Sequence, residues 1–269
     1  MAGDRREPDQ LVADLLQQSG PVTSSTIVVL PLGATEQHGK HLPLETDTLI
    51  AEGICGRLAA RLNETELDAR FLPAESVGYS PEHMDHAGSQ TLTFDAAINR
   101  WTGIGEAVAN AGIRRFVLLN AHGGNSPLMS IVVQELRVRC SQLAVATSWT
   151  RFIKQSGVVS ASEEAFGIHG GDIETSVMLA LHPDRVDMAE ARDFPNLQEM
   201  LALNFKHLRA YGPHAFGWKA ADLNKLGVTG NAGKATAEKG EALLELAVSG
   251  LAELLEDVSN FDLDLLKDA

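Results

Sequence analysis

Residues 115–127 read RFVLLNAHGGNSP, and this stretch decides the fold class. The first six residues, RFVLLN, form a short apolar run that predicts a buried strand. Two glycines follow, and Ser126-Pro127 then predicts the start of a helix that runs to about residue 140, because proline in the first turn loses no helical hydrogen bond. The stretch is therefore a strand–loop–helix unit, as found in sheets of parallel strands.

The same unit recurs along the chain. Strands are expected over residues 26–32, 69–77, 115–120 and 143–149, and helices over residues 46–62, 93–112, 126–140, 171–181 and 234–258. This alternation predicts an α/β fold with a mostly parallel sheet and helices on both faces. Residues 189–233 are less regular, and we expect them to wall a pocket or to contact another subunit. No linker divides residues 1–269, so a single domain is expected.

Composition narrows the function. The chain has 269 residues, 44% of them hydrophobic, and a formal net charge of -14, which disfavours binding to nucleic acid or to an anionic membrane. The polar start MAGDRREPDQ is unlike a signal peptide, and no run approaches the ~20 apolar residues that a membrane span requires. A cytoplasmic protein is expected.

The first candidate site follows the strand at residues 26–32. Glu36 and His38 are two residues apart, so they can face the same side of an extended segment, and Asp47 begins the next helix. Carboxylate and imidazole groups together suit zinc, iron or manganese. An ordinary loop, with a solvated histidine and an acid at a helix N-terminus, is the alternative.

The second candidate, His122 in NAHGGN, follows the strand at residues 115–120 directly. This places His122 at the carboxyl edge of the sheet, where ligands usually bind in such folds. A hydrogen-bonded turn residue is the alternative, and a phosphate loop is disfavoured because the GxxxxGK[ST] pattern is missing.

The third candidate is HGGDIETS at residues 169–176, where His169 precedes a helix and Glu174 lies in its first turn. Asp172 and Glu174 can also be acids that simply complement the helix dipole. Together the three segments supply the histidines and acids of a dinuclear metal site with a shared carboxylate. No cysteine lies at these junctions, which argues against a structural zinc.

Three segments resemble signatures of the creatininase family, in the family's order. They are LPLGATEQHGKHLPLETD (residues 30–47), NAHGGNS (120–126) and HGGDIETS (169–176), and the resemblance spans residues 26–183. It implies a three-layer α/β sandwich and two divalent ions, zinc first with manganese or iron as alternatives. It also implies a homo-oligomer, often a hexamer.

The resemblance also implies roles for individual residues. Glu36 and His122 resemble ligands of one metal, His38 resembles a ligand of the other, and Asp47 resembles the bridging carboxylate. His169 resembles the family's proton-handling histidine. Creatininases carry a glutamate two residues after the NxH histidine, where this chain has Gly124, and in relatives with two glycines there the glutamate of the third segment completes the second site. That residue here is Glu174.

The expected function is hydrolysis of a carbon–nitrogen amide bond in a small molecule, such as a cyclic amide, a formamide or a terminal peptide-like amide. A metal-activated water attacks the carbonyl, and His169 moves a proton to the leaving nitrogen. The alternatives are a peptidase or deformylase acting on a precursor peptide or a pyrimidine nucleotide, and a non-catalytic metal- or metabolite-binding protein. Residues 80–83 (SPEH) are expected to shape the pocket or to be structural, and the sequence identifies no substrate-binding residue.

Overall fold

The computed structural model describes residues 6–266 and contains a sheet of four parallel strands in the order β2-β1-β3-β4. The strands are β1 (Ile27–Leu32), β2 (Ala69–Phe71), β3 (Arg115–Asn120) and β4 (Leu143–Ser148). Leu32 pairs with Asn120, and Asn120 pairs with Ser148, so β1, β3 and β4 end level with one another. The loops that follow β1 and β3 therefore leave the sheet side by side.

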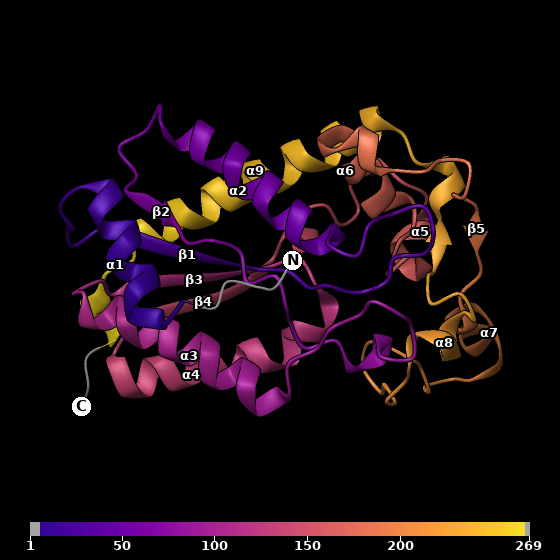
Figure 1. The fold of residues 1–269 in the computed structure, drawn as a ribbon, viewed down its shortest axis with the longest axis horizontal. Coiled ribbons are helices and arrows are strands. Elements are labelled where there is room, and N and C mark those ends of the chain that lie inside the picture. The colour runs from indigo at the N-terminus through magenta and orange to yellow at the C-terminus, as the bar shows by residue number, and fades with distance from the viewer. Residues whose placement is uncertain (1–5, 267–269) are drawn as a thin grey trace.

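Helices cover both faces of this sheet (Figure 1). On one face lie α2 (Thr46–Leu62), α6 (Asp172–Leu181) and α9 (Ala237–Asn260), and on the other lie α1 (Pro8–Ser19), α3 (Phe94–Asn110) and α4 (Ser126–Cys140). Alternate strand residues enter different cores: Val29 packs with the first group, and Val28 and Leu30 pack with the second. Two apolar cores flank the sheet, which confirms the predicted α/β sandwich.

Some element boundaries differ from the prediction. The strand expected over residues 69–77 ends at Phe71, because Pro73 has no N–H to donate, and only isolated bonds such as Glu75 N–H to Pro31 O continue beyond it. The C-terminal helix begins at Ala237, three residues later than expected, where the hydroxyl of Thr236 accepts the Lys239 N–H as an N-cap. Helices α1 and α5 (Ala161–Phe166) were not predicted.

The irregular segment 189–233 contains small elements of its own. They are β5 (Asp193–Phe194), β6 (Gly230–Asn231), α7 (Leu197–Asn204) and α8 (Ala220–Leu223). A small core of Leu201, Ala210 and Leu223 holds it together, and it lies at the end of the molecule beyond the sheet (Figure 1). Thr229 bridges to His169, so the segment sits against one of the predicted site loops.

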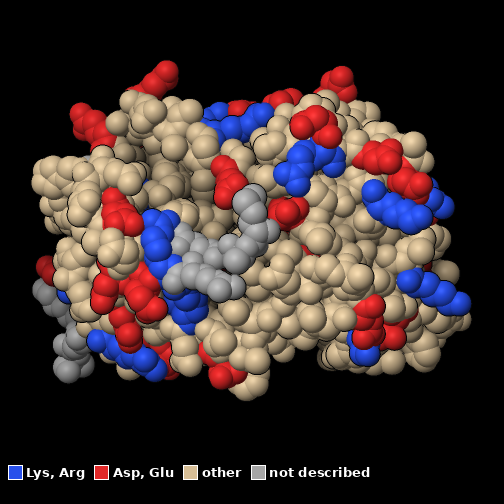
Figure 2. All heavy atoms as spheres, in the orientation of Figure 1, with Lys and Arg blue, Asp and Glu red and all other residues tan. Residues whose placement is uncertain are grey.

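The surface carries charges of both signs. Figure 2 shows acidic and basic side chains interspersed with large neutral areas on the face in view. None of the helices within residues 6–266 is both long and apolar enough to cross a lipid bilayer.

Candidate metal centre

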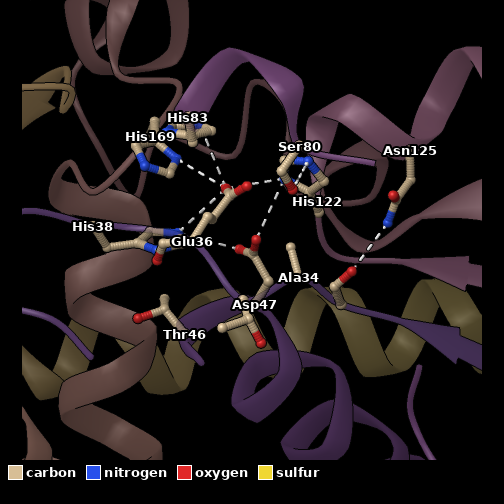
Figure 3. Close-up of polar contacts among 12 residues, drawn as sticks. Ala34, Glu36, His38, Thr46, Asp47, Ser80, His83, His122, Asn125 and His169 are labelled. Carbon is tan, nitrogen blue, oxygen red and sulfur yellow. Dashed lines mark hydrogen bonds and ion pairs between the residues drawn. The ribbon is translucent and has the colours of Figure 1, made fainter. Parts of the chain in front are cut away.

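The structure brings all six predicted site residues together at the carboxyl edge of the sheet (Figure 3, which labels five of them). They come from three segments: the loop after β1 with the first turn of α2, the loop after β3, and the loop between α5 and α6 with the first turn of α6. The third segment was expected at a strand–helix junction, but helix α5 precedes it. These residues are Glu36, His38, Asp47, His122, His169 and Glu174. Because β1 and β3 end level, their loops deliver these side chains to one place.

The first donor group consists of Glu36, Asp47 and His122, which are all buried. Nδ1 of His122 lies 3.0 Å from Oε1 of Glu36 and 3.4 Å from Oδ2 of Asp47. The donor atoms of the three residues lie within 4.8 Å of one another, close enough to share one ion. Two carboxylates and one imidazole match the ligands that the resemblance assigned to one metal.

The second donor group consists of His38, His169 and Glu174. Nε2 of His38 lies 3.8 Å from Oε2 of Glu174 and 3.4 Å from Oδ1 of Asp47. Asp47 therefore presents one carboxylate oxygen to each group, as a bridging ligand does. Oε2 of Glu174 also accepts the Gly170 N–H at 2.6 Å, and this bond holds the carboxylate beside His38.

A third donor group contains His83, a residue that the sequence suggested only as part of a pocket wall. His83 ends the short 3-10 turn η1 (Pro81–His83), and its Nε2 lies 3.6 Å from Oε1 of Glu36. Nδ1 of His169 lies at the same distance from that oxygen. The SPEH motif was the available signal, but no spacing rule connects residue 83 to a loop near residue 36.

The burial of these atoms fits a bound cation. Both carboxylate oxygens of Glu36, Oδ2 of Asp47 and Nε2 of His38 are buried, and no hydrogen bond from a described residue outside the cluster reaches them. An unpaired buried charge costs several kcal/mol in free energy, so atoms of this kind usually coordinate metal or pair with charge. Mixed imidazole and carboxylate ligands suit zinc, manganese or iron. The residues present therefore fit the two divalent ions that the resemblance implies.

Backbone and hydroxyl groups orient the histidines. The carbonyl of Gln37 accepts a hydrogen bond from Nε2 of His169, at 2.7 Å. The carbonyl of Glu36 accepts one from Nδ1 of His38, at 3.0 Å. A carbonyl oxygen cannot donate, so the bonded nitrogen carries a proton and the other nitrogen faces the site. Such bonds fix the tautomer and the direction of a metal-binding histidine.

Electrostatics in the cluster reflect its excess of carboxylates. Burial lowers the pKa of His38, but Asp47, Glu174 and Glu36 outweigh it and raise that pKa to about 9. Burial, with Asp47 and Glu36 nearby, raises the pKa of Glu174 to about 7 although His38 opposes this shift. Burial and the neighbouring imidazoles of His38 and His83 hold the pKa of His169 well below its ordinary value. His169 is therefore neutral at neutral pH.

Gly124 has no room for the glutamate that creatininases carry at this position. A Cβ on Gly124 would lie 2.4 Å from Nε2 of His122, 2.4 Å from the Tyr79 carbonyl and 2.6 Å from Oε1 of Glu82. The Glu82 carboxylate, which comes from η1, fills this space and lies 3.5 Å from Nε2 of His122. Burial raises the pKa of Glu82 above its ordinary value.

Two cavities open beside the site. One, of about 410 Å³, lies between His122, His169 and the side chains of Tyr211 and Trp218. The other, of about 330 Å³, is lined by Trp149, Lys154 and residues of the donor groups. The irregular segment supplies Tyr211 and Trp218, so it does wall a pocket, as expected from its sequence.

Comparisons with known proteins show the family of the chain. The family model "Creatininase: Creatinine amidohydrolase" matches residues 16–255. A creatinine amidohydrolase from Pseudomonas putida is 31% identical over 248 residues, which cover 86% of this chain and 89% of the relative. A mycofactocin precursor peptide peptidase from Mycolicibacterium smegmatis is 29% identical, covering 86% of this chain and 84% of the relative.

Solved structures of creatininases are also similar to the chain. A manganese form of creatininase has a TM-score of 0.70 at 28% identity, and it covers 93% of both chains. A mutant creatininase of the Zn–Zn type has the same TM-score, identity and coverage. Fold and site thus define the class of protein, a hydrolase acting on carbon–nitrogen bonds. The chain belongs to the creatininase family.

Proposed function

We propose that the protein is a metal-dependent amidohydrolase that cleaves the carbon–nitrogen bond of a small amide with water activated at a dinuclear centre. The observation that carries this proposal is the position of Asp47, whose two carboxylate oxygens face two separate donor groups at 3.4 Å each. The relatives support the reaction class, since they include a creatinine amidohydrolase and a peptidase.

Each residue has a proposed part. Glu36 and His122 hold one ion, His38 and Glu174 hold the other, and Asp47 bridges them. When bound, the two ions lower the pKa of a water from ~15.7 towards ~7 and polarise the amide carbonyl. The resident ion is most often zinc in such ligand sets, and manganese and iron fit the same nitrogen and oxygen donors.

His169 is the proposed proton carrier. Its Nε2 donates to the Gln37 carbonyl, so the unprotonated Nδ1 faces the site, and the lowered pKa keeps the ring neutral. A neutral imidazole next to the reacting water accepts a proton and then delivers it to the leaving nitrogen. The His169 side chain also lines the cavity of about 410 Å³, where an amide substrate can reach it.

Metal analysis and activity together test the proposal. We expect up to two divalent ions per chain by elemental analysis, and hydrolysis of at least one member of a panel of cyclic amides, formamides and short peptides. Chelation should remove the activity, and zinc, manganese or iron should restore it. A chain that binds no metal and gains no activity with any of the three would contradict the proposal.

We further propose that residues 1–269 form one domain and that the chain assembles as a homo-oligomer, with a hexamer favoured. The exposed side chains of Leu203 and Phe205 on and after α7 support an interface in the irregular segment. Light scattering that gives a mass near 28.8 kDa would reject the oligomer.

A further inference from the structure

The cavity of about 410 Å³ has an unusual distribution of polar groups. Its wall is mostly apolar or aromatic, including Pro127, Ile168, Tyr211, Trp218 and Leu223. Among the described residues that line it, Glu82 is the one carboxylate, and there is no lysine or arginine. A pocket of this kind orients its ligand through the few polar groups that it contains.

The aromatic residues of the wall already use their polar atoms within the protein. The indole N–H of Trp218 is donated to the Ala210 carbonyl at 2.8 Å, and the hydroxyl of Tyr211 is donated to the Ala165 carbonyl at 2.8 Å. Thr229 adds a hydroxyl without a partner, but a hydroxyl binds donors and acceptors alike and sets no charge preference. Apart from the three histidines of the donor groups, Glu82 is therefore the described wall residue that is left to pair with a charged ligand.

Glu82 stands in a position that suits this role. Its side chain is 14% exposed, and Oε1 lies 3.5 Å from Nε2 of His122, so the carboxylate is next to the donor groups without belonging to one. Nε2 of His122 has closer partners in Ser80 Oγ and the Tyr79 carbonyl, both at 3.1 Å. The Glu82 carboxylate is therefore free of a close hydrogen bond to His122 and can accept one from a ligand.

We propose that Glu82 is a specificity residue that binds a protonated nitrogen of the amide substrate. The apolar part of the substrate then packs against Trp218 and Leu223. An ammonium or guanidinium group gains a charge-assisted hydrogen bond from the carboxylate and an attraction to the indole ring. A phosphate or carboxylate placed against Glu82 would be repelled by that carboxylate. This inference rests on the proposed amidohydrolase function and narrows its substrates to cationic amides.

Binding of two ligands of similar shape tests the inference without turnover. Phenethylammonium carries the charge, and 2-phenylethanol lacks it. By calorimetry we expect the wild-type protein, with its metals, to bind the cation at least about tenfold more tightly, which corresponds to about 1.4 kcal/mol. Glu82→Gln keeps the shape of the side chain and should lose this preference.

Glu164→Gln is the matched control, because Glu164 is exposed and does not line this cavity. It should keep the preference for the cation, and unfolding temperatures should show that both variants remain folded. Any of three results would overturn the inference. The wild type binds no cation, the wild type binds both ligands equally, or the preference for the cation survives in Glu82→Gln. Amide hydrolysis is measured separately, so a failed cation preference and a failed amidohydrolase function give different results.

Discussion

Oδ2 of Asp47 lies 3.4 Å from Nδ1 of His122, although Asp47 lies in the first turn of helix α2 and His122 follows strand β3. The other oxygen of the same carboxylate faces His38 at the same distance. One side chain from one helix terminus therefore connects two donor groups.

Asp47→Ala should be the most damaging change among the proposed ligands. Loss of the bridging carboxylate weakens both metal sites, whereas His122→Ala removes a ligand from one. We expect elemental analysis to find neither ion in Asp47→Ala and one ion in His122→Ala. Turnover in Asp47→Ala should fall at least about 100-fold, since bound metal supplies several kcal/mol of transition-state stabilisation. Two ions and normal turnover in Asp47→Ala would show that the bridge is misassigned.

Glu174→Gln should remove one ion and leave the fold intact. The Glu174 carboxylate faces His38, and without it that ion keeps only His38 and Asp47 among the residues proposed as its ligands, fewer than the three that catalytic zinc usually has. Asp172→Asn, in the same helical turn, is the matched control. Asp172 forms an ion pair with Lys239 and accepts a hydrogen bond from the Ser176 hydroxyl. Asp172→Asn should therefore cost about 1–3 kcal/mol of stability while both ions stay bound. Equal metal content in the two variants would refute the ligand role of Glu174.

Gly124→Ala should disturb the site, and Gly123→Ala should not. A Cβ on Gly124 meets Nε2 of His122 and the Tyr79 carbonyl at 2.4 Å, whereas a Cβ on Gly123 meets nothing within 4 Å. We expect thermal unfolding to show a loss of about 1–3 kcal/mol for Gly124→Ala, typical of overpacking, together with weaker binding of the ion at His122. If both variants match the wild type, the space near His122 is less rigid than the structure indicates.

Metal affinity should rise with pH. In the metal-free protein, carboxylates outweigh burial and raise the pKa of His38 to about 9, and burial raises that of Glu174 to about 7. An ion must displace these protons, which are more fully bound at lower pH, so acid weakens metal binding and alkali strengthens it. Competition with a chromophoric chelator between about pH 6 and 9 should show a rise of about tenfold per pH unit for each displaced proton. Glu174→Gln should flatten the part of this profile at about pH 6 to 7. A flat profile for the wild type would show that metal binding does not displace these protons.

Much of the fold follows from local patterns. The apolar runs at residues 27–32 and 115–120 are too regular for loops, and both are central strands whose residues are buried on both faces. Helix α7 was missed although Asn196 and Glu199 form a capping box, a signal that the sequence does contain. Helix α5 has only six residues, too few to show a helical period.

The site was predictable only where a motif and a junction coincide. Glu36, His38, Asp47 and His122 lie at strand–helix junctions, which sequence periodicity locates, and Glu174 lies in the first turn of a predicted helix. Glu82 and His83 lie on an isolated 3-10 turn, and their proximity to Glu36 and His122 results from tertiary packing. Likewise, no pattern along the chain predicts that Glu82 fills the space beside Gly124.

The level ends of β1 and β3 have a consequence for how the protein folds. The proposed ligands span residues 36 to 174 and meet only when the parallel strands are paired, and parallel pairing requires long crossovers that close slowly. A metal ion therefore finds its complete ligand set only in chains whose sheet is already in register. An ion bound at these residues would not guide the early steps of folding, but it would stabilise the folded chain and shift the equilibrium away from unfolded chains by mass action.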